Sequence, residues 1–190
     1  MKNLGIDLRT MYLALPSNLL LFDGYEDSDI YRKYRNFIDD VINEIETHFS
    51  LPEYGILTLC EHPMKKRHQE GYERHLRINQ RKTGDQKAGG MEYYYKEVLP
   101  LCTAGGCAIT FDDGATPAGV FGELEWLYSN DRQIYLIHFL GDGSIEFHMT
   151  NPEEIKEKKL TIDETRKRLY NPIFPREKRE LIPFVLPKGW

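Results

Sequence analysis

Short apolar runs alternate along the chain with segments in which apolar residues recur every three or four positions. Uninterrupted runs are typical of strands buried on both faces, and the second spacing is typical of amphipathic helices. The clearest predicted helix begins after Asp27 or Ser28, either of which would cap its first turn, and extends to about His48. Buried strands are predicted at TMYLAL (10–15), ILTLC (56–60), GGCAITF (105–111) and RQIYLIHFL (132–140).

Further helices are predicted before and after the strand at 105–111, and a weaker pattern follows the last strand. MEYYYKEVLPL, residues 91–101, predicts a helix broken at its proline, and GVFGELEWLYSN, residues 119–130, predicts another. After the turn GDG, SIEFHM predicts a short edge strand. A charged helix is predicted over residues 152–169, with a second start at Thr161.

This order of elements predicts the fold class. Strands that alternate with helices indicate a three-layer α/β fold, with a mostly parallel, doubly wound sheet of about five strands, as in flavodoxin-like and Rossmann-like domains. Ligands of such sheets bind outside the carboxyl ends of the strands. Tyr12, Asp112 and Asp113 are at or near predicted strand ends on that edge, so we expect a site there.

The predicted organisation is an α/β core followed by a C-terminal segment. We assign residues 1–150 to the core and 151–190 to a helix and a proline-rich apolar tail that packs on the core or on a neighbouring subunit of a homo-oligomer. Residues 62–90 are polar and basic and end in KAGG, which predicts an irregular or partly helical insertion. Its local excess of positive charge would suit a phosphate, or would form one face of a solvated helix.

Charge and cysteine usage narrow the class of protein. A net charge of −5 argues against a general nucleic-acid-binding protein. No apolar run approaches the ~20 residues of a membrane-spanning helix, and the mixed charges of the first nine positions do not resemble a secretory signal. Cys60, Cys102 and Cys107 lie in or beside apolar runs, which predicts buried thiols in a reducing, cytoplasmic environment.

Candidate chemistry is concentrated in FDDGATPAGVFGELEWLY, residues 111–128, which joins a strand to a helix. Gly114 and Gly119 would let the backbone approach a ligand closely, next to a helix N-terminus with free N–H groups. Glu123 is near that terminus, which predicts a stabilised anion suited to a nucleophile. Helical periodicity does not choose between Glu123 and Glu125; we prefer Glu123 because it is closer to the loop.

The segments around residues 10–16 and 92–140 resemble the nucleoside 2-deoxyribosyltransferase superfamily. The similar features are the strand YLALP with Tyr12, the strand end FDDG, and the helix GVFGELEWLY before a buried strand. The resemblance implies that Glu123 attacks C1′ of the sugar and forms a covalent glycosyl-enzyme, while Asp112 or Asp113 helps to protonate the departing base. It also implies that Tyr12 lies by the nucleophile or the sugar, and that Glu97 replaces an Asp that holds the sugar hydroxyl.

The leading hypothesis is therefore an enzyme that cleaves or transfers an N-glycosidic bond in a nucleoside or nucleotide, as a transferase or a hydrolase. One alternative is a non-catalytic nucleotide-binding sensor or interaction domain on the same scaffold, and another is an NAD glycohydrolase. The cysteine and histidines of residues 60–75 match no standard zinc spacing. We expect neither a metal nor a cofactor, and no nucleic-acid or membrane partner.

Overall fold

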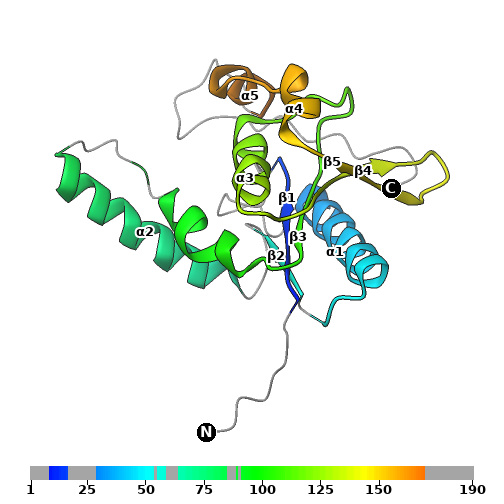
Figure 1. The fold of residues 1–190 in the computed structure, drawn as a ribbon, viewed down its shortest axis with the longest axis horizontal. Coiled ribbons are helices and arrows are strands. Elements are labelled where there is room, and N and C mark those ends of the chain that lie inside the picture. The colour runs from blue at the N-terminus through cyan, green and yellow to red at the C-terminus, as the bar shows by residue number, and fades with distance from the viewer. Residues whose placement is uncertain are drawn as a thin grey trace, which may run out of the picture.

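The computed structural model describes residues 9–16, 29–53, 55–58, 64–84, 89 and 91–169. A five-stranded sheet lies at its centre (Figure 1). The strands are β1 (Met11–Ala14), β2 (Ile56–Thr58), β3 (Gly105–Ala108), β4 (Ile134–Phe139) and β5 (Ile145–Thr150). The helical elements are α1 (Asp29–Phe49), α2 (Met64–Thr83), η2 (Tyr94–Val98), η3 (Leu99–Leu101), α3 (Ala118–Ser129), α4 (Pro152–Ile155), η4 (Lys156–Lys158) and α5 (Ile162–Leu169).

The sheet has the order β2-β1-β3-β4-β5, and its first four strands in the sequence are parallel. Only β5 runs antiparallel, paired along its whole length with β4 at one edge. This confirms the predicted three-layer, mostly parallel α/β fold and the predicted edge strand. From β1 the chain leads first to β2 on one side and later to β3 on the other, as in flavodoxin-like sheets, whose ligands bind where the strand order reverses.

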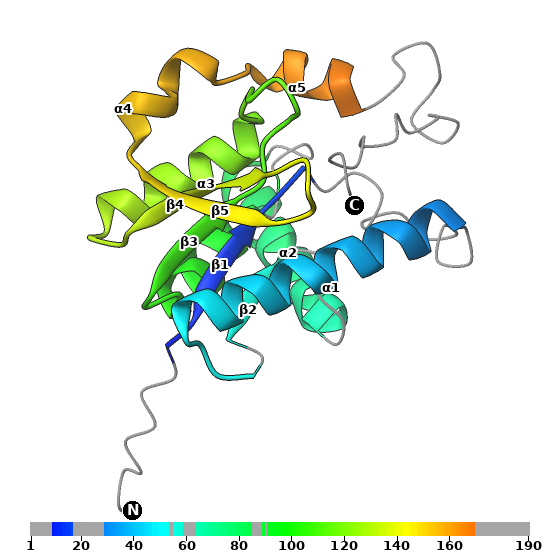
Figure 2. The ribbon, with the colours of Figure 1, turned by 90° about the vertical axis from the view of Figure 1, so that its right-hand side faces the viewer.

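The amphipathic helix α1 covers one face of the sheet (Figure 2). Its apolar stripe packs on the odd-numbered side chains of β1 and β3 because alternate residues of a strand point to opposite faces. The buried residues of this layer are Met11, Leu13, Leu15, Phe37, Ile38, Val41, Ile42, Ile45, Ile56, Cys107, Ile109 and Ile137. Both predicted capping residues of α1, Asp27 and Ser28, lie outside the described residues.

Helix α3 covers the opposite face, together with η2 and η3. The even-numbered side chains of β1 and β3 meet this layer, which includes Ile155 from α4, so the segment after β5 contributes to the same core. The buried residues are Tyr12, Ala14, Tyr93, Tyr94, Val98, Leu99, Cys102, Ala108, Val120, Phe121, Leu124, Leu127, Ile134 and Ile155.

The basic insertion is more regular than predicted. Most of residues 62–90 form the 20-residue helix α2, which projects to one side of the sheet in Figure 1. A short contact on one face anchors it: a Cβ at Gly71 would come within 2.2 Å of the ring of Tyr93, and Tyr72 packs against the α3-side core. Glycine permits this close approach, and a pattern of apolar residues in the sequence does not reveal it.

Residues 91–101 are helical, as predicted, but with unusual hydrogen bonding. η2 is a π-helix, in which the N–H of Leu99 donates to the carbonyl of Tyr94, and η3 is a 3-10 turn with Pro100 near its start. Proline has no N–H and displaces the carbonyl four residues earlier, which accounts for a wider and then a tighter turn at this position.

The predicted helix over residues 152–169 is divided into α4, η4 and α5. The second predicted start is confirmed: the N–H of Thr161 donates to the carboxylate of Glu164, and the N–H of Glu164 donates to the Thr161 hydroxyl, which forms a capping box. Before it, Thr116 and Lys159 form an isolated bridge that ties the segment to the β3–α3 crossing. The proline-rich tail lies outside the described residues.

Cys102 and Cys107 are buried free thiols, as predicted, whereas Cys60 lies outside the described residues. Burial raises the pKa of Cys102 to about 12 and raises that of Cys107 further, so both are unreactive thiols at neutral pH. Among the described helices, none combines the length and the apolar character that a bilayer crossing requires.

Candidate functional site

A buried hydrogen bond joins two of the predicted site residues across the interface between sheet and helix. The hydroxyl of Tyr12 donates to Oε1 of Glu123 over 3.1 Å. Tyr12 has no exposed surface, and Glu123 is 2% exposed. Tyr12 is the second residue of β1 and not its last. Its side chain packs in the core between the sheet and α3.

Packing of α3 decides which glutamate enters the interior. Val120, Leu124 and Leu127 are buried against the sheet, and Glu123 shares their side of the helix. Glu125 is exposed. Of the two glutamates, Glu123 is thus the buried one. In the sequence, only its proximity to the loop distinguished it from Glu125.

Burial controls the charge of Glu123. It raises the pKa of the carboxyl group to about 8, and the hydrogen bond from Tyr12 offsets this in part by lowering the pKa. The prediction of an anion stabilised by the helix N-terminus is therefore wrong. Glu123 lies beyond the first turn of α3, which begins at Ala118, and the effect of the helix dipole declines within that turn.

Tyr95 adds a second phenol beside this carboxyl group. A Cβ at Gly122 would lie 2.8 Å from the Tyr95 hydroxyl, so the glycine before Glu123 leaves room for it. Burial, followed by the charges of Glu123 and Glu125, raises the pKa of Tyr95 to about 12. Of the three consecutive tyrosines, Tyr93 and Tyr94 are core residues, and Tyr95 is the one close to the buried acid.

The two aspartates lie on an exposed turn after β3. Asp112 Oδ1 accepts the N–H of Asp113 at 3.0 Å, and Asp113 Oδ1 accepts the N–H of Ala115 at 3.0 Å. Arg168 of α5 also donates to both carboxylate oxygens of Asp113. The Ala115 N–H and then the Arg168 guanidinium lower the pKa of Asp113, which therefore has a clear structural role, as turn residues of this type often do.

Glu97 also has partners away from the buried acid. His75 Nε2 lies 2.8 Å from its carboxylate, and Arg74 donates to both oxygens, so Glu97 links η2 to α2. The hydrogen bonds from His75 and Arg74 lower the pKa of this carboxyl group. These contacts occupy the carboxylate that the family resemblance assigns to the sugar hydroxyl.

The two glycines of the crossing differ in their surroundings. Gly114 has φ +77°, a conformation that favours glycine, and a Cβ there would lie 2.9 Å from Nζ of Lys158. Gly119 is in the first turn of α3 and faces open space. The second glycine therefore leaves backbone accessible beside a helix N-terminus.

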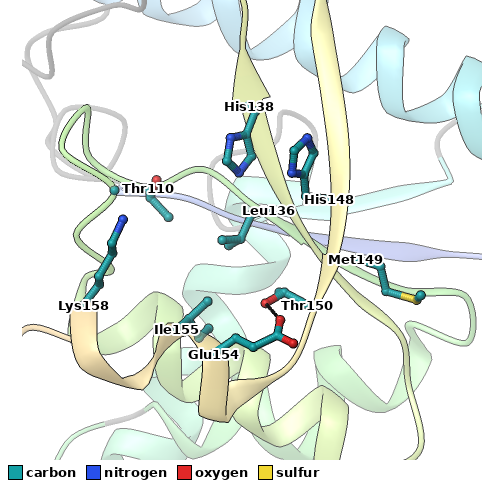
Figure 3. A pocket seen from close by; sticks show the side chains of 10 residues that line it. Thr110, Leu136, His138, His148, Met149, Thr150, Glu154, Ile155 and Lys158 are labelled. Atoms are coloured by element: carbon teal, nitrogen blue, oxygen red, sulfur yellow. Dashed lines mark hydrogen bonds between the residues drawn. The ribbon is translucent and has the colours of Figure 1, made fainter.

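A cavity of about 300 Å³ lies between the β4–β5 hairpin and the α4–η4 segment (Figure 3). It extends from the carboxyl ends of β3 and β4, at Thr110 and His138, to Thr150, which pairs with the first residue of β4. We call it the β4–β5 cavity. Its lining residues are Thr110, Gly114, Leu136, His138, His148, Met149, Thr150, Glu154, Ile155 and Lys158. Of the predicted site residues, Gly114 lines this cavity, whereas the two histidines were not predicted.

The sequence did not predict this pair of histidines because they belong to separate strands. His138 lies in RQIYLIHFL and His148 in SIEFHM. The antiparallel register pairs Leu136 with His148, which places His148 on the same face of the hairpin as His138, two residues after Leu136. Two histidines at same-face positions of a predicted hairpin are the signal that would have revealed them.

Within the described residues, no group of three or more His, Cys, Asp or Glu side chains is arranged to hold a metal ion. Comparisons with known protein families, with curated proteins and with solved structures find no match to this chain. The geometry of the site therefore carries the functional argument.

Proposed function

We propose that this protein cleaves or transfers the N-glycosidic bond of a nucleoside- or nucleotide-type substrate, with Glu123 as nucleophile. The observation that supports this most is the buried hydrogen bond from Tyr12 to Glu123. It joins the two segments that resemble the nucleoside 2-deoxyribosyltransferase superfamily, and it places a phenolic donor on the carboxyl group that would attack.

The proposed reaction is a double displacement at C1′ of the sugar. The Glu123 carboxylate forms a bond to C1′ while the C1′–N bond breaks, and the base leaves with the bonding electrons and takes up a proton. Water or a second base then attacks C1′ and releases Glu123, as in retaining glycoside chemistry. Hydrolysis and transfer differ only in this second nucleophile.

Only the ionised form of Glu123 can act as the nucleophile. With a pKa of about 8, about a tenth of the molecules carry the carboxylate at neutral pH. The Tyr12 hydrogen bond stabilises this form because a phenol donates more strongly to a carboxylate than to a neutral acid. Tyr12 is thus proposed as the residue that keeps part of the Glu123 population reactive.

The proton for the departing base requires a second group. Asp113 is held by Arg168 and Ala115, and Glu97 by Arg74 and His75. Asp112, whose carboxylate accepts one backbone N–H on the exposed turn, is the better of the two aspartates for a proton-transfer or orienting role.

Replacement of Glu123 by Gln tests the proposal. Gln has the shape of the protonated acid and keeps an oxygen that accepts from Tyr12, so the variant should fold normally. We expect the loss of base release from every active substrate in a panel of (deoxy)nucleosides, nucleotides and NAD, measured by chromatography. Glu125→Gln, two residues away and exposed, is the matched control and should retain turnover.

Unchanged turnover in the Glu123→Gln variant would exclude this nucleophile. The protonated state of Glu123 at neutral pH favours one other function, that of a non-catalytic nucleotide-binding domain, because a neutral acid binds ligands as a hydrogen-bond donor but does not attack C1′. Saturable nucleotide binding by the wild-type protein, without base release from any member of the panel, would support that second function.

A further inference from the structure

The β4–β5 cavity gathers one lysine and two histidines from three elements. Figure 3 shows the imidazoles of His138 and His148 side by side above Leu136, while Lys158 extends from η4 toward Thr110. The two rings are stacked, with centroids 4.1 Å apart and an interplanar angle of 15°. If both imidazoles were protonated, they would repel each other at this distance unless an anion lay beside them.

Two of these three side chains, Lys158 and His138, form no ion pair within the described residues, whereas His148 does. Lys158 forms no ion pair with any carboxylate of the described residues, and its ammonium lies against the backbone of Gly114. His148 Nε2 is 3.0 Å from Glu146, on the same strand. The imidazole of His138 is exposed and has no hydrogen-bond partner among the described residues.

Other parts of the cavity wall suit the organic portion of a small ligand. Leu136 and the buried Ile155 supply apolar surface. At the end away from the imidazoles, the Thr150 hydroxyl donates to Glu154 over 2.8 Å, and the remaining carboxylate oxygen would accept a hydrogen bond from a ligand hydroxyl or amine. The volume of about 300 Å³ is at the lower end of the range for small-molecule sites.

We propose that the β4–β5 cavity is a binding site for a small phosphorylated ligand, whose phosphate group lies against Lys158, His138 and His148. Tetrahedral oxygens accept hydrogen bonds from several donors at once, and each contact to a charged group is worth more than a neutral one. The phosphate end of the site, at Thr110 and His138, lies at the carboxyl ends of β3 and β4, where ligands of doubly wound sheets bind. The site does not include Glu123.

Proton uptake accompanies binding at this site. Burial, His148 and Lys158 lower the pKa of His138, and Glu146 opposes them. Glu154 is the other charged group on the cavity wall. An anion that stabilises the imidazolium raises the pKa of His138, so affinity increases as the pH falls toward the range in which histidine is protonated.

The test uses NMR of the histidine ring protons of the full chain during titration with inorganic phosphate at constant ionic strength. We expect saturable shifts of both imidazoles. Lys158→Gln should lower the affinity at least about tenfold, whereas Lys156→Gln, on the same short helix and outside the cavity, should change it less than about twofold. Shifts that do not saturate, or an equal loss in both variants, would overturn the proposal.

Sulfate keeps a constant charge between about pH 5 and 8, where histidine titrates. A change in sulfate affinity over this range therefore reports protonation of the protein and not of the ligand. The affinity for sulfate should rise as the pH falls in the wild-type protein and remain nearly constant in His138→Asn. A pH-independent affinity in the wild-type protein, or saturation by Zn²⁺ with no response to phosphate or sulfate, would contradict the proposal.

Competition identifies the source of the phosphate. Displacement of inorganic phosphate by a nucleoside 5′-monophosphate would place the phosphate of a substrate here, and displacement by a sugar phosphate alone would indicate a separate effector. Both results support the site. The titration is repeated with Glu123→Gln, in which binding should persist, so that a failure of the proposed catalytic role is distinguished from a failure of the phosphate site.

Discussion

At the scale of single residues, the chemistry depends on how far the protein interior suppresses the charge of Glu123. Burial raises the pKa of its carboxyl group to about 8, whereas the hydrogen bond from Tyr12 lowers the pKa. The raised pKa of Glu123 therefore affects stability and activity in opposite ways as the pH changes. A low pH favours the folded state at this residue, and a high pH favours the nucleophile.

The stability effect follows from proton binding. In the unfolded chain Glu123 titrates near its ordinary value of 4.5, and in the folded protein near 8. Between these values the folded state binds more protons, so stability decreases as the pH rises, by about 1.4 kcal/mol per pH unit at most. Urea denaturation should therefore show that Glu123→Gln gains stability relative to the wild-type protein between about pH 5 and 8. A difference that is independent of pH would argue against a raised pKa.

Tyr12→Phe isolates the contribution of the phenol to reactivity. Loss of the donor raises the pKa of Glu123 further, so the rise of kcat/KM with pH should move to a higher pH than the value near 8 in the wild-type protein. Loss of the hydrogen bond should also cost about 1 kcal/mol of stability. A reduced rate with an unshifted pH profile would instead indicate that Tyr12 acts only on the substrate.

These residues show how far sequence reasoning reaches at this scale. The spacing of Val120, Leu124 and Leu127 predicts a buried stripe, but Glu123 and Glu125 flank it equally. Only the depth of packing separates them, and the same depth reverses the predicted charge of Glu123. A helix-terminus effect is visible in a sequence, whereas desolvation depends on the surrounding elements and is not.

At the scale of elements, glycine positions determine how helices approach their neighbours. Gly71 of α2 lies against the ring of Tyr93, where a Cβ would come within 2.2 Å of ring carbons. Gly119 of α3 faces open space. The same substitution should therefore have opposite effects in the two helices.

We expect Gly71→Ala to destabilise the protein by about 1–3 kcal/mol, because overpacking separates α2 from η2. Gly119→Ala should be neutral or stabilising by up to about 1 kcal/mol, since Ala has the higher helix propensity. Thermal denaturation measures both. If Gly119→Ala lowers the affinity for a substrate without loss of stability, close approach of the ligand to this backbone is supported. A destabilised Gly119→Ala variant would show that the surface there is not open.

Elements with a continuous apolar signal were predictable, and those fixed by a few contacts were not. The buried strands and the helices α1 and α3 follow from spacing alone. Residues 62–90 lack such a pattern, because α2 is held by the small contact around Gly71 and Tyr72 and by the polar contacts of Glu97. The interruption of residues 152–169 depends on Thr116, which pairs with Lys159 across the fold.

At the scale of the whole molecule, the order of the strands places two candidate sites on one sheet. The side chain of Glu123 lies between α3 and β1. The β4–β5 cavity lies between the β4–β5 hairpin and the α4–η4 segment and reaches the carboxyl ends of β3 and β4. The sequence predicted the edge of the sheet for a ligand, because that rule depends only on alternating strands and helices. It did not predict the cavity, because His138 and His148 come together only through the register of β4 and β5, which the sequence does not reveal.

The same topology predicts an uneven distribution of local stability. β1 and β3 are central parallel strands and are fully buried, so successive amides donate to neighbours on alternate sides. Among the described strands, β5 pairs only with β4, and it is partly exposed along its length. Every second amide of β5 therefore points to its outer side, where the described residues supply no strand partner. Hydrogen exchange should be slow at consecutive amides of β1 and β3, with protection close to that of global unfolding, and alternately fast and slow along β5. Uniform protection of β5 that is lost on dilution would mean that another chain pairs with its outer edge, which would reveal the interface of the predicted homo-oligomer.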